Sequence, residues 1–185
     1  MTLKVYGGAR SRASIIQWYL EEIGLDYEFV FVDLQAGEQN QPKFLAINPI
    51  GKVPAIQDGD LALWESGAIL LYLAERYGQP SASIQERAVW GQWVLFANAT
   101  LGPALFTDNL REKEGSRMLS AVNGVLKETE FLNGDTFTVV DVAVGSYLSY
   151  ARMMLSLDFA DYPAIATYVS QIESRPAYQK TIAAR

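Results

Sequence analysis

The 185-residue sequence contains neither cysteine nor histidine. Without cysteine there can be no disulfide, thiolate metal ligand or redox-active cysteine pair, and without histidine there is no imidazole ligand or Ser-His catalytic pair. Carboxylates are the only side-chain metal ligands left, and a carboxylate-held metal has no support in the sequence. We therefore expect no metal and no resident cofactor, and a reaction that needs a thiol must take it from a substrate.

Positive charge and long apolar runs are also scarce. Fifteen Lys and Arg against 21 Asp and Glu give a formal charge of −6, whereas proteins that bind nucleic acids or anionic membranes carry basic surfaces. The longest apolar run, at residues 68–74, is far shorter than the roughly 20 residues of a membrane helix. The N-terminus runs directly into a strand-like pattern instead of a targeting peptide. We expect a cytoplasmic protein that binds neither nucleic acid nor membrane.

Residues 1–77 alternate the hydrophobic patterns of strands and helices, which predicts an α/β domain with a hairpin at one end. Gly24 follows a helical pattern at the place where a left-handed residue ends a helix, and Asp58-Gly59-Asp60 separates the two strands of the hairpin. The predicted strands are 3–6, 27–32, 52–57 and 61–64, and the predicted helices are 11–23, 42–47 and 65–77.

Residues 78–83, GQPSAS, are small and polar and include a proline, which predicts a linker. The remaining residues, 84–185, show helical patterns and no convincing strand, so we predict an all-helical second domain. Gly102-Pro103 is expected to interrupt the first long helical pattern. The other predicted helices are 112–132, 137–155 and 162–174.

Two short motifs in the first domain suggest a peptide-binding site. A proline after Val53 cannot donate to a strand ladder, and a cis Val53-Pro54 bond would point the Val53 N–H and C=O outward for pairing with a bound peptide. Ser66 lies at a helix start, where free N–H groups favour a carboxylate, and the adjacent Glu65 could hold an ammonium group. Each motif also has a plain structural interpretation, Ser66 as a helix cap and Val53-Pro54 as a strand edge.

The chain as a whole resembles the cytosolic glutathione transferases, in particular the bacterial beta- and chi-like classes. The resemblance rests on LKVYG (3–7), EEIGLDYE (21–28), NPIGKVPAIQDGDLALWESGAILLYLAERYG (48–78), FTVVDVAVG (137–145) and YPAIATYVSQIESRPAYQ (162–179). It implies a thioredoxin-like domain at 1–77, a linker at 78–83, a helical domain at 84–185 that contributes the electrophile pocket, and a homodimer.

The resemblance also implies roles for the residues of the two motifs. Val53 would pair with the cysteinyl backbone of glutathione, with Pro54 as a cis proline, and Glu65 and Ser66 would hold the γ-glutamyl group. Lys52 could meet the glycyl carboxylate, although it could equally be an ordinary exposed lysine at a strand start.

In the second domain, the resemblance also gives Thr138 and Asp141 the roles of a helix capping box, and Asp141→Ala should cost on the order of 1 kcal/mol through the cap. That role is structural and has no direct part in catalysis.

The position that activates the thiol departs from the family pattern. Where related classes carry Ser or Cys, a count back from Gly24 arrives at Arg10, with Ser11 beside it and Tyr6 at the end of the first strand. A guanidinium at a helix start can stabilise a thiolate, so we predict Arg10 as the activating residue, assisted by Ser11. The Ser11 hydroxyl is the neutral alternative for activating the thiol, and Tyr6 is a third candidate. The plain interpretations are an Arg10 that is only a solvated loop cation and a Tyr6 that belongs to the core.

Leu105, Phe106 and Tyr150 are candidates for an apolar electrophile pocket between the domains, although aromatic residues at helical spacing are more often core. The leading hypothesis is a glutathione transferase that detoxifies hydrophobic electrophiles such as aryl halides and isothiocyanates, with glutathione as co-substrate. The alternative is a non-catalytic module of the same fold that holds ligands or partner proteins. A thiol-disulfide reductase of this fold would need a protein cysteine, which the chain lacks.

Overall fold

The computed structural model describes residues 2–78 and 82–184, and the chain forms two compact units. One unit comprises Met1–Ala82 together with Ala177–Arg185, and the other comprises Ser83–Pro176. The predicted division placed everything from residue 84 onward in the helical domain, whereas the structure groups the last residues with the first unit. Residues 79–81 of the predicted linker lie outside the described residues.

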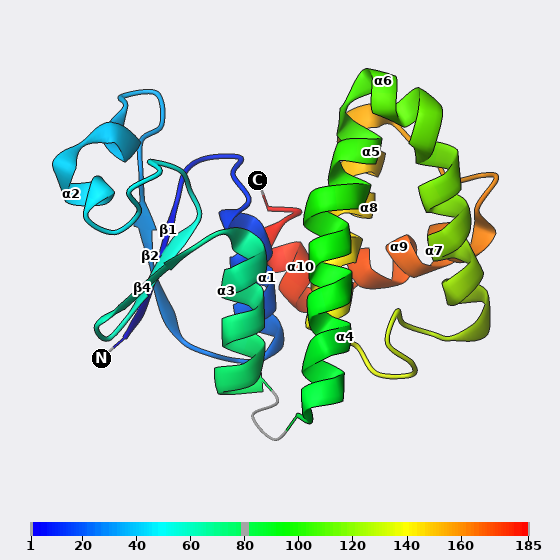
Figure 1. Ribbon diagram of the computed structural model, residues 1–185, viewed down its shortest axis with the longest axis horizontal. Coiled ribbons are helices and arrows are strands. Elements are labelled where there is room, and N and C mark those ends of the chain that lie inside the picture. The colour runs from blue at the N-terminus through cyan, green and yellow to red at the C-terminus, as the bar shows by residue number, and fades with distance from the viewer. Residues whose placement is uncertain (1, 79–81, 185) are drawn as a thin grey trace. The chain divides into compact units, whose positions relative to one another are not determined.

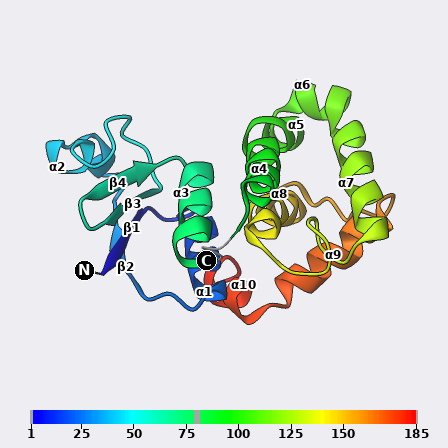
Figure 2. The ribbon, with the colours of Figure 1, turned by 60° about the horizontal axis from the view of Figure 1, so that its bottom comes forward.

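The first unit has the predicted β-α-β-α-β-β-α order and a thioredoxin-like arrangement (Figure 1). Its four strands lie in the order β2-β1-β3-β4, with β1 parallel to β2 and antiparallel to β3, and β3 antiparallel to β4. Helices α1 and α3 cover one face of the sheet, and the short α2 lies on the other side (Figure 2). The bounds are β1 Leu3–Gly7, α1 Ala13–Glu22, β2 Tyr27–Phe31, a 3₁₀ turn Glu38–Asn40, α2 Pro42–Leu45, β3 Ala55–Asp58, β4 Leu61–Trp64, α3 Ser66–Leu73 and a π-helical turn Ala74–Gly78.

Local sequence signals explain most of these boundaries. Gly24 has a φ of 64°, so the predicted left-handed end of α1 is confirmed. The hairpin between β3 and β4 is also confirmed, with Gly59 at a φ of 59° in its two-residue loop. The prediction started β3 too early, because Pro54 cannot donate to the ladder and pairing begins at Ala55.

A short C-terminal helix, α10 (Pro176–Thr181), was missed by the sequence analysis and belongs largely to the first unit. It packs beside α1, where the rings of Trp18 and Tyr178 meet edge to face with centroids 5.3 Å apart. Lys180 Nζ lies 2.6 Å from a carboxylate oxygen of Glu21. These two contacts explain why the end of the chain joins the first unit.

The second unit is helical throughout, apart from one isolated β-bridge between Phe131 and Gly134. Helix α8 is its most buried element and packs against α4, α5 and α9 (Figure 2). No helix within 2–78 and 82–184 is long and apolar enough to cross a membrane. The bounds are α4 Ile84–Leu95, a π-helical turn Phe96–Leu101, α5 Gly102–Phe106, α6 Asp108–Leu110, a π-helical turn Arg111–Gly115, α7 Ser116–Glu128, α8 Val139–Leu155 and α9 Pro163–Glu173.

The helix is expected to be interrupted at Gly102-Pro103, and the structure shows a π-helical segment directly before these two residues. The six residues Phe96–Leu101 form a π-helical segment between α4 and α5, so the chain stays helical through this stretch. Pro103 lies in the first turn of α5, where a missing N–H costs little.

Asp141 secures the start of α8 and is fully buried. The predicted capping box is confirmed, with the Asp141 carboxylate accepting from the Thr138 N–H at 2.8 Å. The carboxylate also accepts from the Leu132 N–H at 3.0 Å and from the Tyr168 hydroxyl at 3.0 Å. Burial raises the pKa of Asp141, and these hydrogen bonds oppose that rise. Asp141 thus joins α8, α9 and the preceding loop.

We predict that Asp141→Ala lowers the free energy of unfolding by about 3 kcal/mol, more than the cap alone accounts for, because several buried donors lose their acceptor. Urea denaturation followed by circular dichroism measures the loss. Tyr168→Phe, which removes one donor and keeps the carboxylate, should lose about 1 kcal/mol. Equal losses in the two variants would contradict this role of Asp141.

Candidate functional site

Strand pairing brings three loops to one end of the sheet. Tyr6 of β1 pairs with Ala55 of β3, and Ala55 pairs with Trp64 of β4. The loop after β1, the segment before β3 and the segment after β4 must therefore extend from the same edge. These three segments carry the predicted site residues of the first unit: Arg10, Ser11, Lys52, Val53, Pro54, Glu65 and Ser66.

The segment before β3 ends in the predicted cis proline. The Val53-Pro54 peptide bond is cis, and Val53 is half-buried against the core cluster that contains Tyr6 and Ala55. Val53 lies outside the ladder, since β3 begins at Ala55. Its backbone is placed at the sheet end, as peptide pairing requires.

Asn48 holds the loop that leads to Val53, a role that the sequence analysis missed. Its side chain is almost fully buried, donates from Nδ2 to the Lys52 carbonyl at 2.6 Å and accepts at Oδ1 from the Ile50 N–H at 2.9 Å. The signal was present in the sequence, since Asn followed by Pro and Gly is typical of a side-chain-closed turn. Asn48 therefore fixes the backbone just before the cis proline.

Gly51 and Gln39 complete the packing of this loop. Gly51 has a φ of 66°, and a Cβ there would lie 3.1 Å from the Gln39 carbonyl oxygen, so a larger residue would be both strained and crowded. The Gln39 side-chain Oε1 is buried and has no hydrogen-bond partner among the described residues. Lys52, which follows Gly51, is exposed, and among the described residues only its backbone carbonyl has a hydrogen-bond partner, the Asn48 side chain.

The segment after β4 turns sharply into α3. Glu65 is exposed at the N-cap position with a φ of 69°, and Ser66 is the first residue of the helix and only 4% exposed. The N–H groups of the first helical turn have no partner within the helix and carry the positive end of its dipole. This end of α3 can accept a carboxylate, and Glu65 can accept an ammonium group beside it.

The loop between β1 and α1 carries Arg10 and Ser11. Ser11 Oγ accepts from the N–H groups of Gly8 at 3.2 Å and Ala13 at 3.3 Å. A hydroxyl that accepts hydrogen bonds becomes a better donor itself. Arg10 has a φ of 52°, is exposed, and makes no hydrogen bond or ion pair with another described residue.

Tyr6 belongs to the core. It is 9% exposed, its ring meets that of Phe44 at a centroid distance of 6.1 Å, and its hydroxyl donates to Gln57 at 3.1 Å. These contacts occupy the side chain on the sheet, which favours the core interpretation over a role in thiol activation.

The three candidates for the electrophile pocket all lie in the second unit. Leu105 is fully buried, whereas Phe106 and Tyr150 are half-buried. The Phe106 ring lies against that of Tyr147, with centroids 6.3 Å apart. Their role in a pocket stays a prediction.

The arrangement suits recognition of a small charged peptide through backbone and helix-end contacts. Within 2–78 and 82–184, no group of three or more carboxylates is placed to hold a metal ion. The first-unit site combines a backbone edge at Val53, a helix start at Ser66 and a polarised hydroxyl at Ser11.

Comparison with known protein families gives two matches. Residues 1–75 match the model described as the N-terminal domain of glutathione S-transferase, and residues 107–176 match its C-terminal domain. The two matched regions together include every candidate site residue except Leu105 and Phe106.

Curated proteins and a solved structure are similar over most of the chain. The disulfide-bond oxidoreductase YfcG of Escherichia coli is 35% identical over 88% of this chain and 86% of its own, and glutathione S-transferase PARB of Nicotiana tabacum is 33% identical over 97% of both. A crystal structure of glutathione transferase URE2P6 from Phanerochaete chrysosporium, in complex with oxidized glutathione, has a TM-score of 0.86 at 28% identity over 99% of this chain and 96% of its own.

We predict that Asn48→Ala lowers the free energy of unfolding by about 2 kcal/mol, because the Lys52 carbonyl and the Ile50 N–H both lose their hydrogen-bond partner. Chemical denaturation measures this. Asn48→Asp keeps the acceptor for Ile50 but cannot donate to Lys52, and should also be destabilised. A fully stable Asn48→Ala variant would show that the side chain does not hold the loop.

Proposed function

Since the chain belongs to the glutathione S-transferase family, we propose that it binds glutathione at the shared end of β1, β3 and β4 and transfers its thiolate to an electrophilic carbon. The observation that carries this proposal is the meeting of the cis Val53-Pro54 segment, the α3 start and the Ser11 loop at one sheet edge. The bound oxidized glutathione of the URE2P6 structure supports the choice of ligand.

Each part of the tripeptide has a matching group in the site. The Val53 backbone would pair with the cysteinyl residue, as an added strand pairs with a sheet edge. The γ-glutamyl carboxylate would lie at the start of α3, on the N–H groups and hydroxyl of Ser66, with its ammonium group on Glu65. Lys52, exposed next to Val53, would meet the glycyl carboxylate.

Arg10 and Ser11 would share the stabilisation of the thiolate. A free thiol has a pKa of about 8.5, and lowering it by two units takes about 3 kcal/mol of preferential stabilisation. The Ser11 hydroxyl would donate to the sulfur, and the Arg10 guanidinium would add positive charge without an ion pair to another described residue to neutralise it.

The groups that exchange bonds in this reaction are the bound thiol and the electrophile. The thiol proton leaves to solvent, and the sulfur lone pair forms a bond to the electrophilic carbon. With an aryl halide the halide departs with the carbon–halogen electron pair. With an isothiocyanate the electrons move to nitrogen, which takes up a proton.

We place the apolar electrophile against Phe106 and Tyr150, which keep some exposed surface, whereas Leu105 is fully buried. We also propose a bacterial beta- or chi-like homodimer that works in detoxification in the cytoplasm, where glutathione keeps thiols reduced.

The similarity to YfcG favours a second candidate activity. That relative is named a disulfide-bond oxidoreductase, and this chain has no cysteine of its own. Two glutathione molecules could still reduce a small disulfide: each disulfide sulfur leaves as a thiol, and the two glutathione sulfurs join as glutathione disulfide.

Glutathione oxidation with hydroxyethyl disulfide tests this activity, and conjugation of 1-chloro-2,4-dinitrobenzene tests the transferase. A protein that binds glutathione but is inactive in both assays would be the non-catalytic module.

We predict that Ser66→Ala weakens glutathione binding about tenfold, because a hydrogen bond to a charged group is worth about 1.5–3 kcal/mol. Isothermal titration calorimetry measures the dissociation constant. Ser146→Ala is a matched control, because Ser146 is also a buried helical serine but lies in α8 of the second unit. Unchanged binding in Ser66→Ala would contradict the proposed place of the γ-glutamyl group.

We predict that Arg10→Ala raises the pKa of the bound thiol by about one unit, since a nearby opposite charge shifts a pKa by about 1–3 units. Ultraviolet absorbance of the thiolate, recorded against pH, measures this shift. Arg10→Lys should keep most of the effect, and Ser11→Ala should also raise the pKa.

Tyr6→Phe serves as the control for these variants, because the Tyr6 hydroxyl is engaged with Gln57. If Arg10→Ala leaves the thiol pKa unchanged while Ser11→Ala raises it, the hydroxyl alone activates the thiol. A raised pKa in Tyr6→Phe would assign the role to Tyr6.

A further inference from the structure

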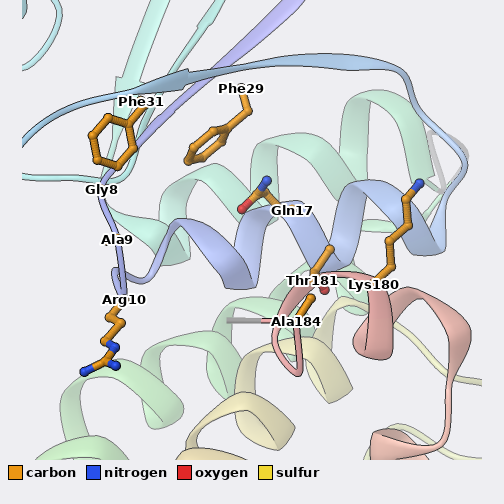
Figure 3. Close-up of a pocket in the computed structure, with 9 residues that line it drawn as sticks. All are labelled: Gly8, Ala9, Arg10, Gln17, Phe29, Phe31, Lys180, Thr181 and Ala184. Atoms are coloured by element: carbon orange, nitrogen blue, oxygen red, sulfur yellow. The ribbon is translucent and has the colours of Figure 1, made fainter.

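Two consecutive glycines, Gly7 and Gly8, lead from β1 into the loop that carries Ser11. Residues 8–10 of this loop line one side of a cavity of about 430 Å³, together with residues of α1, β2 and the C-terminal segment (Figure 3). Neither glycine has a positive φ, in contrast to Gly24. A left-handed turn is therefore not the reason why these two positions lack a side chain.

Gly8 lacks a side chain because the segment after β2 lies directly on its main chain. A Cβ on Gly8 would lie 2.7 Å from Cδ1 and Cγ of Leu34 and 3.1 Å from the carbonyl oxygen of Val32. Since carbon atoms attract each other best at about 3.5–4.0 Å, these separations are too short to be kept. Even one methyl group at residue 8 would have to push the loop away or displace the segment after β2.

The segment after β2 is the part that is held in place. Val32 is 4% exposed, and its N–H donates to the Gly7 carbonyl at 2.9 Å. Leu34 packs against the core cluster that contains Tyr6. The loop, in contrast, has free space beside it in the cavity. A methyl group at residue 8 would therefore move the loop more than it moves the core.

Gly7 allows a second close approach, that of the start of α1. A Cβ on Gly7 would overlap the Cβ of Ala13 and lie 2.9 Å from Cε2 of Phe29. The absence of a side chain at residue 7 thus lets Ala13 pack against the end of β1.

Both close approaches place a hydrogen-bond donor on the Ser11 hydroxyl. The Gly8 N–H donates to Ser11 Oγ at 3.2 Å, and the Ala13 N–H donates to the same oxygen at 3.3 Å. These distances lie at the long end of the range for N–H···O hydrogen bonds, so a displacement of a few tenths of an ångström weakens them. The position of the loop at Gly8 therefore decides how strongly the hydroxyl is polarised.

We propose that Gly8 is a positioning residue for thiol activation, which acts through Ser11. Its missing side chain lets the loop lie on Val32 and Leu34 at the depth where the Gly8 N–H reaches Ser11 Oγ. This inference rests on the proposed function, because it gives the Ser11 hydroxyl the task of stabilising the glutathione thiolate.

The first test is Gly8→Ala in the full chain, with circular dichroism to verify that the variant is folded. The pKa of the bound glutathione thiol, measured by ultraviolet absorbance against pH, should rise by about half a unit, as expected when one hydrogen bond is weakened. Binding of S-methylglutathione, which has no ionisable thiol, should be unchanged in calorimetry, because Val53 and Ser66 lie on other segments. Gly91→Ala is the matched control, since a Cβ on this α4 glycine meets no atom within 4 Å.

Two double variants test the route of the effect. In a Ser11→Ala background, Gly8→Ala should add no further rise of the thiol pKa, because residues that act through one another are not additive. In a Leu34→Ala background, Gly8→Ala should raise the pKa much less than it does in the parent, because the two side-chain contacts at 2.7 Å are gone.

Hydrogen exchange in the free protein tests the contact without any ligand and without a change at residue 8. The Gly8 amide should exchange about tenfold faster in Ser11→Ala than in the parent, because it loses its acceptor. This measurement keeps the proposal falsifiable if Gly8→Ala does not fold.

The proposal is overturned if folded Gly8→Ala keeps the parent's thiol pKa, if its effect is undiminished in the Ser11→Ala background, or if the exchange of the Gly8 amide does not depend on Ser11. A loss of stability with no change in thiol pKa would give Gly8 a structural role alone. If the exchange rate responds as expected but the parent protein does not lower the pKa of the glutathione thiol, the hydroxyl contact is confirmed and the proposed function fails. The two failures are thus distinguishable.

Discussion

The backbone pairing of β1, β3 and β4 is the constraint on which the candidate site depends. The row Tyr6–Ala55–Trp64 aligns three strands so that their loops leave the sheet at one edge. If one strand slipped by one residue, each of its side chains would turn to the opposite face of the sheet, and its loop would move out of line with the other two. The site is therefore a consequence of hydrogen bonding within the sheet, and each loop needs only local features to place its own residue.

Those local features are of different kinds in the three loops. Asn48 closes the turn before the cis proline with two side-chain hydrogen bonds, Ser11 collects two backbone N–H groups before α1, and Glu65 takes a positive φ where α3 begins. Under the proposed function, in a chain without cysteine or histidine, these backbone and hydroxyl groups would provide most of the ligand recognition. The reactive sulfur would arrive with the ligand.

Much of the fold of both units could be predicted from sequence because the signals are local. The hairpin at Gly59, the left-handed Gly24 and the capping box at Asp141 depend on neighbours within a few residues, and all are confirmed. The place of α10 depends on tertiary contacts, which periodicity does not report. The additional hydrogen bond of Asp141 to Tyr168 joins residues 27 apart in sequence, so the cap alone underestimated the role of Asp141.

The residues of the candidate site that belong to short sequence motifs could be proposed from the sequence. Val53, Pro54, Glu65 and Ser66 were proposed from their motifs, and the structure brings their segments to one edge of the sheet, while their role in binding stays a prediction. Sequence spacing could not decide between Arg10 and Ser11, because they are neighbours whose environments differ only in three dimensions. The contact of α10 with α1 had no signal in sequence, since Trp18 and Tyr178 lie about 160 residues apart.

Nuclear magnetic resonance of the ¹⁵N-labelled protein during titration with glutathione tests the central claim most directly. The account predicts that the amide signals of Val53, Ser66 and Gly67 shift together and saturate with one ligand per chain. If these amides stay unchanged while glutathione binds elsewhere, or if no signal moves at millimolar glutathione, the account is contradicted.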